Sequence, residues 1–261
     1  MFWPIYKLSV IATKNIFMVR IIASTLFFVL YSPFLSAQQK VSFYSEDGLK
    51  ITADLYLKDY QLPFILLFHQ GESSRGEFSE IAPRLMKLDY NCLAVDLRAG
   101  EKMNYIVNET ATRARENNYS QTFYNARKDI KAAMEYVKKF NNKDIILFGS
   151  SYSASLCLIE AASNPNIKAV IAFSPGEFFR PEVTVKDSIS GLQIPLFIYA
   201  TSMEFEFVQQ MVSDIHDGNK KIFTPLKNKG EHGAKTLFQT SESSNECWLE
   251  LLLFFKNIRY N

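Results

Sequence analysis

A glycine and a serine two positions apart, Gly149 and Ser151, form the pattern in this chain that is best suited to chemistry. The apolar run before them (146–148) predicts a buried strand, and the spacing of residues 153, 156, 157 and 160 predicts a helix after them. A serine on the tight turn between strand and helix has its hydroxyl raised clear of the backbone, beside the first N–H groups of the helix. Such a serine can attack a carbonyl group; the alternative is that the serines here only cap the helix.

A serine hydroxyl needs a base to remove its proton, and histidine is the side chain whose pKa suits that task. The chain has three histidines. His216 lies at the end of a predicted helix and is expected in solvent. His69 ends a predicted strand, where we expect it to anchor a loop rather than to act as a base. His232 lies in a loop flanked by glycines after the last predicted strand, and it is the preferred candidate.

Strands and helices alternate along most of the chain, which predicts how these residues are positioned. An Asp-Gly turn at 47–48 between two alternating segments predicts an antiparallel hairpin over 40–58. Apolar runs predict strands near 64–69, 91–96, 146–149, 169–173, 195–200 and 221–224, with helices near 78–88, 123–140, 153–163, 205–215 and 246–256. We therefore expect one α/β domain over 38–261, with a mostly parallel sheet covered by helices on both faces and opened by the hairpin. The polar segment 100–121 and the turn-rich segment 174–193 are expected to be loops that shape a site.

In such a sheet, ligands bind beyond the carboxyl ends of the strands. Residues there include 68–71, 96–100, Ser151, the loop 201–206 and the loop 230–234. In order and sequence, these segments resemble the α/β-hydrolase fold, in particular its dienelactone-hydrolase-like and small serine esterase branch. The resemblance implies that Ser151 is the nucleophile, that His232 is the general base, and that a carboxylate follows the strand that ends near Ala200. It also implies an oxyanion hole made by the N–H of Tyr152 and one from Gln70 or Gly71.

The sequence departs from the family pattern at two positions. Ser153 stands where the second glycine of G-x-S-x-G is usual, and the loop 201–206 has no aspartate. Glutamate can replace aspartate chemically, and Glu204 is favoured over Glu206 because it is closer to the strand end. The alternative is that both glutamates only begin a helix, where acidic residues are favoured.

Five other residues have simpler interpretations. Ser150 is expected to cap the helix after the turn, and Asp96 to organise its loop through local amides. Glu177 is expected either to line a pocket or to lie in solvent, and Phe178 and Phe179 to be core residues or a pocket wall.

The N-terminal 37 residues are expected to be a signal peptide or a hydrophobic N-terminal segment, and not part of the fold. Their only charges are Lys7, Lys14 and Arg20, and an apolar run ends in Leu35-Ser36-Ala37, which resembles a cleavage site. The true start is expected at Met18, and an uncleaved anchor is the alternative. This segment predicts a secreted or periplasmic protein.

Composition limits the partners and cofactors. The formal net charge is +2, and the N-terminal segment holds three positive charges and no negative one, so the remainder is close to neutral. Neutrality argues against nucleic acid or an anionic membrane surface as the main partner. The three cysteines, Cys92, Cys157 and Cys247, show no metal-binding spacing or disulfide framework. We expect a small-molecule acyl substrate and neither a metal nor an organic cofactor.

The leading hypothesis is therefore an exported serine hydrolase that cleaves a carboxylic ester, lactone or similar acyl substrate. One alternative is a binding protein that has lost catalysis, which the missing aspartate favours. The other is a serine peptidase, which ranks lower because no separate domain is present to select peptide ends.

Overall fold

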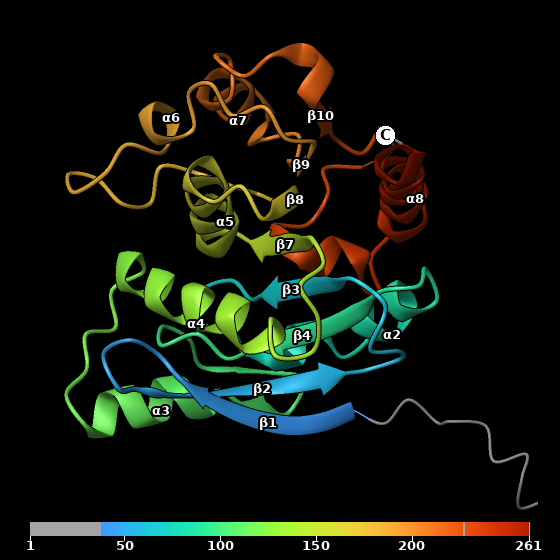
Figure 1. Cartoon of the computed structure of the whole chain (residues 1–261). Helices are drawn as coiled ribbons and strands as arrows, with labels where there is room; N and C mark the ends of the chain where they lie inside the picture. The colour runs from blue at the N-terminus through green and yellow to red at the C-terminus, as the bar shows by residue number, and fades with distance from the viewer. Residues whose placement is uncertain (1–37, 227, 261) are drawn as a thin grey trace, which may run out of the picture. The chain divides into compact units, whose positions relative to one another are not determined.

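The computed structural model describes residues 38–226 and 228–260, which form an eight-stranded sheet and a separate two-stranded one. The order of the large sheet is β1-β2-β4-β3-β7-β8-β9-β10 (Figure 1). Its strands are β1 (Gln38–Tyr44), β2 (Lys50–Tyr56), β3 (Phe64–Phe68), β4 (Asn91–Val95), β7 (Ile145–Ser150), β8 (Ile167–Phe173), β9 (Leu196–Tyr199) and β10 (Lys220–Phe223).

The expected antiparallel hairpin opens a sheet that is otherwise mostly parallel. β1 pairs with β2 in antiparallel register around the turn at Asp47 and Gly48, and β2 pairs antiparallel with β4. From β4 onward all neighbours are parallel. The predicted fold class is confirmed.

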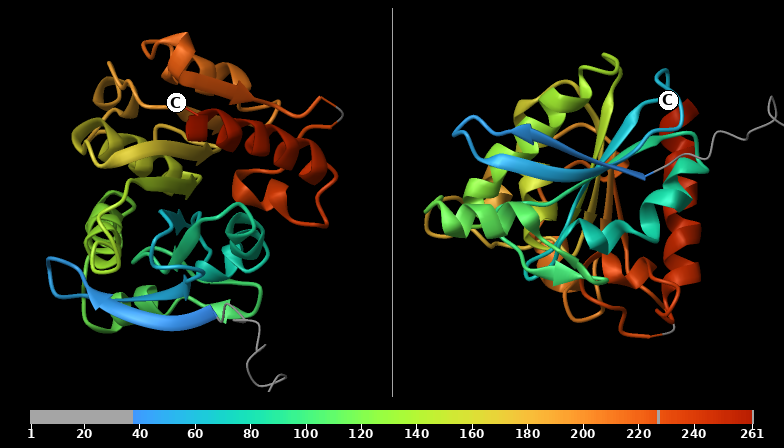
Figure 2. Two further views of the ribbon diagram at one scale, coloured as in Figure 1. Left: turned by 45° about the vertical axis from the view of Figure 1, so that its right-hand side comes forward. Right: turned by 90° about the horizontal axis from the view of Figure 1, so that it is seen from below.

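Helices cover both faces of the sheet, as the right-hand view in Figure 2 shows. One core contains residues of α4, α5 and α7, and the other contains residues of α2 and α8. The helices are α2 (Ile81–Met86), α3 (Glu109–Glu116), α4 (Arg127–Val137), α5 (Tyr152–Ser163), α6 (Val185–Ser188), α7 (Phe205–Met211) and α8 (Ser244–Tyr260), with 3-10 turns η2 (Arg75–Phe78), η3 (Tyr124–Ala126), η4 (Asp217–Asn219) and η5 (Gly233–Leu237).

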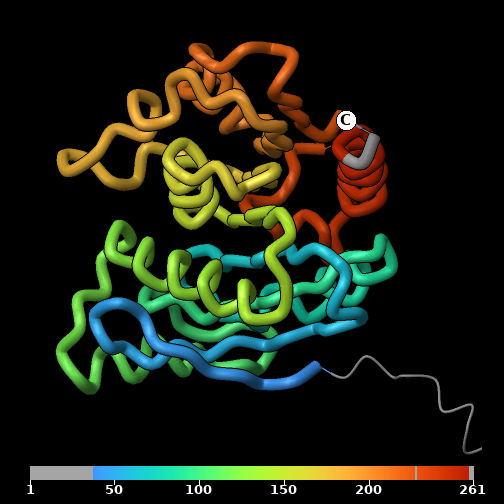
Figure 3. Tube along the Cα trace, viewed as in Figure 1, coloured from blue at the N-terminus to red at the C-terminus, as the bar shows by residue number. Residues whose placement is uncertain are grey.

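Between β3 and β7, the direction in which successive strands are added to the sheet reverses. The chain moves outward from β3 to β4 on one side and from β7 through β8 and β9 to β10 on the other. The blue-green and gold-red halves of the tube in Figure 3 follow this division. The carboxyl ends of two neighbouring parallel strands at such a reversal leave a crevice, which is where α/β sheets bind ligands.

The segment 100–121 is not the plain loop that its sequence predicts. It holds β5 (Lys102–Met103), β6 (Ile106–Val107) and α3. The side chain of Asn108 caps α3 by accepting from the N–H of Ala111, but the helix buries only Thr110, Ala111 and Ala114. Because these buried residues are small or polar, the segment shows no apolar periodicity. The short helix α6 inside 174–193 was also missed. It has four residues and buries only Val185, so it leaves no periodic pattern either.

The expected signal segment, residues 1–37, lies outside the described residues. Within 38–226 and 228–260, none of the helices has the length and apolar character needed to cross a membrane. All three cysteines are free and buried.

Candidate active site

Ser151 lies on a sharp turn between β7 and α5, with a backbone φ of 60° and ψ of −123°. A positive φ is unfavourable for any residue with a Cβ atom, and such strain in native proteins clusters at functional sites. The turn needs Gly149, because a Cβ atom there would lie 2.4 Å from the Cα of Ala154. The side chain of Ser151 is nearly buried, and its hydroxyl faces the imidazole of His232.

Ser153, which replaces the usual second glycine, is accommodated by hydrogen bonds. Its buried hydroxyl accepts from the N–H of Ser150 at 2.9 Å and donates to the carbonyl of Phe68 at 2.7 Å. The substitution thus joins the turn to the end of β3. The close approach of strand and helix survives it.

The structure brings together Ser151, His232 and Glu204 from three distant segments. Nε2 of His232 lies 2.8 Å from the hydroxyl oxygen of Ser151, and Nδ1 lies 2.6 Å from Oε1 of Glu204. This geometry fits an imidazole that carries its proton on Nδ1, donates it to the carboxylate and accepts from the serine. Glu206, the alternative acid, is exposed on α7.

Glu204 is held as a carboxylate by several donors. Oε2 accepts from the hydroxyl of Ser174 at 2.7 Å and from the N–H of Thr201 at 3.0 Å. Burial alone would raise the pKa of Glu204, but the hydrogen bonds from His232, Thr201 and Ser174 outweigh it and lower the pKa to about 2. The acid is therefore ionised around neutral pH.

Two serines that the sequence analysis did not assign to the site hold the histidine loop. The hydroxyl of Ser174 accepts from the N–H of Gly233 at 3.0 Å, and that of Ser150 accepts from the N–H of Ala234 at 2.9 Å. Ser150 was expected to cap α5, and that expectation was wrong, because its hydroxyl faces the histidine loop instead. The only signal for these roles in the sequence was the position of each serine at a strand end.

The two other histidines lie apart from this arrangement. His69 is buried, with Nδ1 2.7 Å from its neighbouring carbonyl at Gln70 and Nε2 accepting from the N–H of Leu97 at 3.0 Å. Burial lowers the pKa of His69, and both ring nitrogens are occupied. His216 accepts from the N–H of Gly218 at the surface.

The candidate oxyanion N–H groups come from the residues after two neighbouring strands: Tyr152 directly follows Ser151 after β7, and Gly71 lies three residues after the end of β3. Tyr152 is the first residue of α5, and the first N–H of a helix has no partner within the helix. The N–H of Gln70, the other candidate for the oxyanion hole, already donates to Oε2 of the buried Glu77 at 2.9 Å. Of the two N–H groups that the sequence left open, the one of Gly71 therefore fits an oxyanion hole better.

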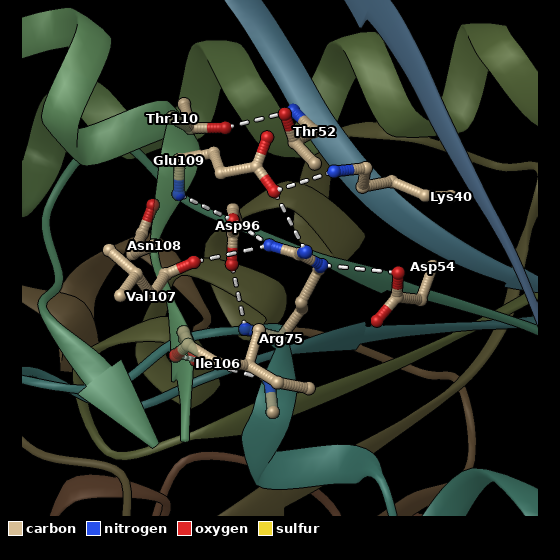
Figure 4. A network of polar contacts seen from close by, with 12 residues as sticks. Lys40, Thr52, Asp54, Arg75, Asp96, Ile106, Val107, Asn108, Glu109 and Thr110 are labelled. Carbon is tan, nitrogen blue, oxygen red and sulfur yellow. Dashed lines mark hydrogen bonds and ion pairs between the residues drawn. The ribbon is translucent and has the colours of Figure 1, made fainter. Parts of the chain in front are cut away.

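An ion-pair network centred on Arg75 (Figure 4) lies at the end of the loop that follows β3. The guanidinium of Arg75 contacts Asp54 at 3.1 Å, Asp96 at 2.6 Å and Glu109 at 3.0 Å. Asp96 also accepts from the N–H of Arg75 and of Glu109, each at 2.8 Å, so it organises its loop as expected. The network ties the start of α3 to β2 and to the loop after β3.

The remaining candidates have structural roles. The carboxylate of Glu177 accepts from the N–H groups of Val185 and Lys186 and thereby caps α6. Phe179 is buried, whereas Phe178 is partly exposed. Among the described residues, no group of three or more His, Cys, Asp or Glu side chains is placed to hold a metal ion.

Solved structures with the same fold include three described as hydrolases. An esterase from Pyrococcus furiosus matches with a TM-score of 0.61 at 18% identity, over 85% of this chain and 91% of its own. A dienelactone hydrolase from Anabaena variabilis matches with 0.64 at 14%, over 85% and 97%. The esterase domain of a Rhodothermus marinus protein matches with 0.59 at 15%, over 85% and 98%. At such identities these likenesses show the fold alone.

Comparison with curated proteins gives no match. The family model of the dienelactone hydrolase family matches residues 51–229, which include Ser151 and Glu204 and end just before His232. A match over this much of the chain, together with the esterase neighbours, supports a hydrolase of the ester or lactone type. The chain belongs to the dienelactone hydrolase family and has the α/β-hydrolase fold.

Proposed function

We propose that this protein is a serine hydrolase that cleaves a carboxylic ester or lactone through an acyl-enzyme on Ser151. The observation that carries the proposal is the hydrogen-bonded line from Ser151 through His232 to Glu204. Ser151 follows β7, Glu204 precedes α7 and His232 precedes η5, so three separate segments supply the three residues, and the serine has a strained backbone with a φ of 60°. Family membership supports the same reaction class.

The reaction would proceed in two halves. His232 Nε2 accepts the hydroxyl proton as the Ser151 oxygen attacks the carbonyl carbon, and then donates that proton to the leaving alkoxide. The ionised Glu204 stabilises the imidazolium that forms between these steps. The N–H groups of Tyr152 and Gly71 would hold the carbonyl oxygen while it carries negative charge. Water attacks the acyl-enzyme in the second half, with the same histidine as the base.

A fluorophosphonate probe tests the proposal, because it labels only serines that a base has activated. We expect Ser151 to be labelled and the Ser151→Ala variant to lose both labelling and hydrolysis of p-nitrophenyl esters, with its melting temperature retained. Ser163→Ala is the matched control, since this exposed serine is the last residue of the same helix, α5. Unlabelled wild-type protein, or a Ser151→Ala variant with full activity, would remove this serine from the mechanism.

Two alternatives yield different results in the same assay. A binding protein that has lost catalysis would leave Ser151 unlabelled. The lack of an aspartate in the loop 201–206 had favoured this alternative. The contacts of Glu204 oppose it, because Glu204 supplies a carboxylate to His232 in place of that aspartate. A peptidase would be labelled but would release amines from peptide substrates faster than alcohols from esters.

We also propose that the hydrolase domain, 38–261, is exported through the N-terminal segment. The support is the apolar run with its flanking basic residues and the Leu35-Ser36-Ala37 sequence. Mass spectrometry of the mature N-terminus in the producing cell tests this. A mature chain that retains residues 1–37 would contradict cleavage and favour an anchor.

A further inference from the structure

Two aromatic side chains beside the candidate active site stay partly exposed. Phe123 and Phe178 each keep 39% of their surface accessible, although their sequence neighbours are packed. Tyr124 and Phe179 are those neighbours, and their rings contact one another at a centroid distance of 5.7 Å. The segments before α4 and after β8 are thus joined by one aromatic pair, and each presents a second ring to solvent.

The ring of Phe123 lies against both residues that carry the candidate oxyanion N–H groups. It stacks on Tyr152 with a centroid distance of 4.1 Å and an interplanar angle of 12°. On its other side, a Cβ atom at Gly71 would lie 3.3 Å from the Cζ atom of Phe123. Tyr152 itself is fixed, because its buried hydroxyl donates to the carbonyl of Ala99 at 2.9 Å. The position of the Phe123 ring is therefore set by the buried ring of Tyr152 and by Gly71.

Phe178 is held near the next turn of the same helix. Its ring packs on Gly176, where a Cβ atom would come within 3.0 Å of it. Gly176 is bonded to the buried hydroxyl of Ser155 through both its N–H, at 2.8 Å, and its carbonyl, at 2.7 Å. Ser155 follows Tyr152 by three positions, so both lie on one face of α5. The two exposed rings consequently flank one stretch of the helix that begins beside Ser151.

The orientation of the reaction assigns this stretch to the acyl side of a substrate. The leaving oxygen must face Nε2 of His232, which protonates it, so the other substituent of the carbonyl carbon points away from the histidine. Phe123 contacts the ring of Tyr152 and lies beside Gly71, the two residues that carry the candidate oxyanion N–H groups. The acyl group would therefore pass along the exposed aromatic rings.

The charges nearby favour an uncharged acyl group. Arg98 is buried and bonded to Asp47 and Asp129, and Arg127 is bonded to Glu160. These two arginines are thus already paired with carboxylates of the fold, and Arg180, which follows Phe179, lies 3.8 Å from the carboxylate of Glu177. A flat apolar group, by contrast, can stack on the exposed rings, and an aromatic pair adds about 0.5–1.5 kcal/mol beyond the area that it buries.

We propose that Phe123 and Phe178 form an acyl-binding site for an uncharged aromatic group, so that the preferred substrates are esters of arylalkanoic acids. The inference rests on the proposed function and names the substrate class of the same site. Phe123 is its main specificity-determining residue, because its ring packs on Tyr152, the residue after Ser151, and Phe178 extends the site along α5.

The test compares p-nitrophenyl phenylacetate with p-nitrophenyl acetate, which share one leaving group. Wild-type protein is expected to have the higher kcat/KM for phenylacetate. Phe123→Ala should lower that value by roughly tenfold or more and change the value for acetate by less than about threefold. Phe178→Ala should act in the same direction and more weakly. Tyr60→Ala is the control, since this exposed ring lies in the loop before β3, at the opposite end of the strands.

A binding measurement separates failure of the inference from failure of the proposed function. In the Ser151→Ala background, p-nitrophenyl phenylacetate should bind more tightly than the acetate, and Phe123→Ala should abolish the difference. Equal losses for both esters, a wild-type preference for acetate, or equal binding of both would overturn the inference. If wild-type protein cleaves neither ester, the proposed function fails, and the binding comparison still decides whether the aromatic site exists.

Discussion

Glu204→Gln tests whether the carboxylate beside His232 belongs to a catalytic triad. Oε1 of Glu204 accepts from the imidazole, and Oε2 accepts from Ser174 and from the N–H of Thr201. A glutamine has one acceptor oxygen where the carboxylate has two. If its amide NH2 group faces Thr201, that group and the N–H of Thr201 are both donors, and the hydrogen bond between them is lost. If it faces His232, it donates to Nδ1 and forces the proton onto Nε2, which then cannot accept from Ser151.

The expected effect is large because one arrangement removes the reactive tautomer, the other loses the hydrogen bond from Thr201, and both remove the negative charge that stabilises the imidazolium. An equivalent exchange in a serine protease triad lowers kcat by about ten-thousandfold. A thousandfold to ten-thousandfold loss corresponds to ~4–5 kcal/mol of activation free energy. Glu204→Asp should also lose activity, since removal of one methylene group withdraws the carboxylate by about 1.5 Å from a contact that is 2.6 Å long.

The assay is kcat for a p-nitrophenyl ester, with the rate of fluorophosphonate labelling as a second readout and the melting temperature as a check on folding. Glu206→Gln is the matched control on the exposed side of α7 and should stay within about twofold of wild type. A folded Glu204→Gln variant with more than a tenth of wild-type activity would refute the assignment. Equal losses in both variants would show that the charge of this helix start matters, and not the contact with His232.

Three further predictions concern the stability of the fold around the site. Arg75→Met should lower the free energy of unfolding by about 3–5 kcal/mol in urea titrations, because it leaves two buried aspartates without their cation; a loss under 1 kcal/mol would contradict the role of the network. Gly149→Ala should destabilise the turn, since its Cβ atom would meet backbone at 2.4 Å, and an unchanged melting temperature would show that the turn can relax. The ionised Glu204 has a pKa of about 2, below its usual 4.5, so its contribution to stability is full above pH 4.5 and is lost as the pH falls toward 2. The difference in melting temperature between wild type and Glu204→Gln should therefore narrow between pH 6 and pH 3, whereas a constant difference would mean that the ionised form is not the stabilised one.

The fold was predictable because its signals are local. Apolar runs such as 64–68 and the Asp-Gly turn at 47–48 depend only on neighbouring residues, and each became the expected strand or hairpin. The helix α3 was missed because it buries small and polar residues, which leave no periodic pattern. Its position depends instead on the buried Arg75, whose partners lie on β2, after β4 and on α3 itself.

The residues of the site also differ in how far the local sequence predicts their roles. The turn at Ser151 has a local pattern, and the sequence named it along with His232. The choice between Gln70 and Gly71 could not be made from the sequence, because it depends on a hydrogen bond from Gln70 to Glu77, seven residues away and in another element. The roles of Ser150 and Ser174 depend on the path of the loop 230–234, which no pattern in these segments indicates.

The two strained serines of the site are held by the same structural device. Ser151 and Ser174 both have positive φ angles, of 60° and 52°, at the carboxyl ends of the neighbouring strands β7 and β8. Each continues the hydrogen bonding of the sheet by one residue, since Ser151 N–H donates to Phe173 at 2.7 Å and Ser174 N–H donates to Tyr199 at 2.8 Å. The sheet thus offsets backbone strain of about 1–3 kcal/mol per residue and fixes both hydroxyls without help from a flexible loop. The hydroxyl of Ser151 then faces Nε2 of His232, and the hydroxyl of Ser174 faces the carboxylate of Glu204. The rigid strand ends therefore fix both ends of the hydrogen-bonded series Ser151–His232–Glu204.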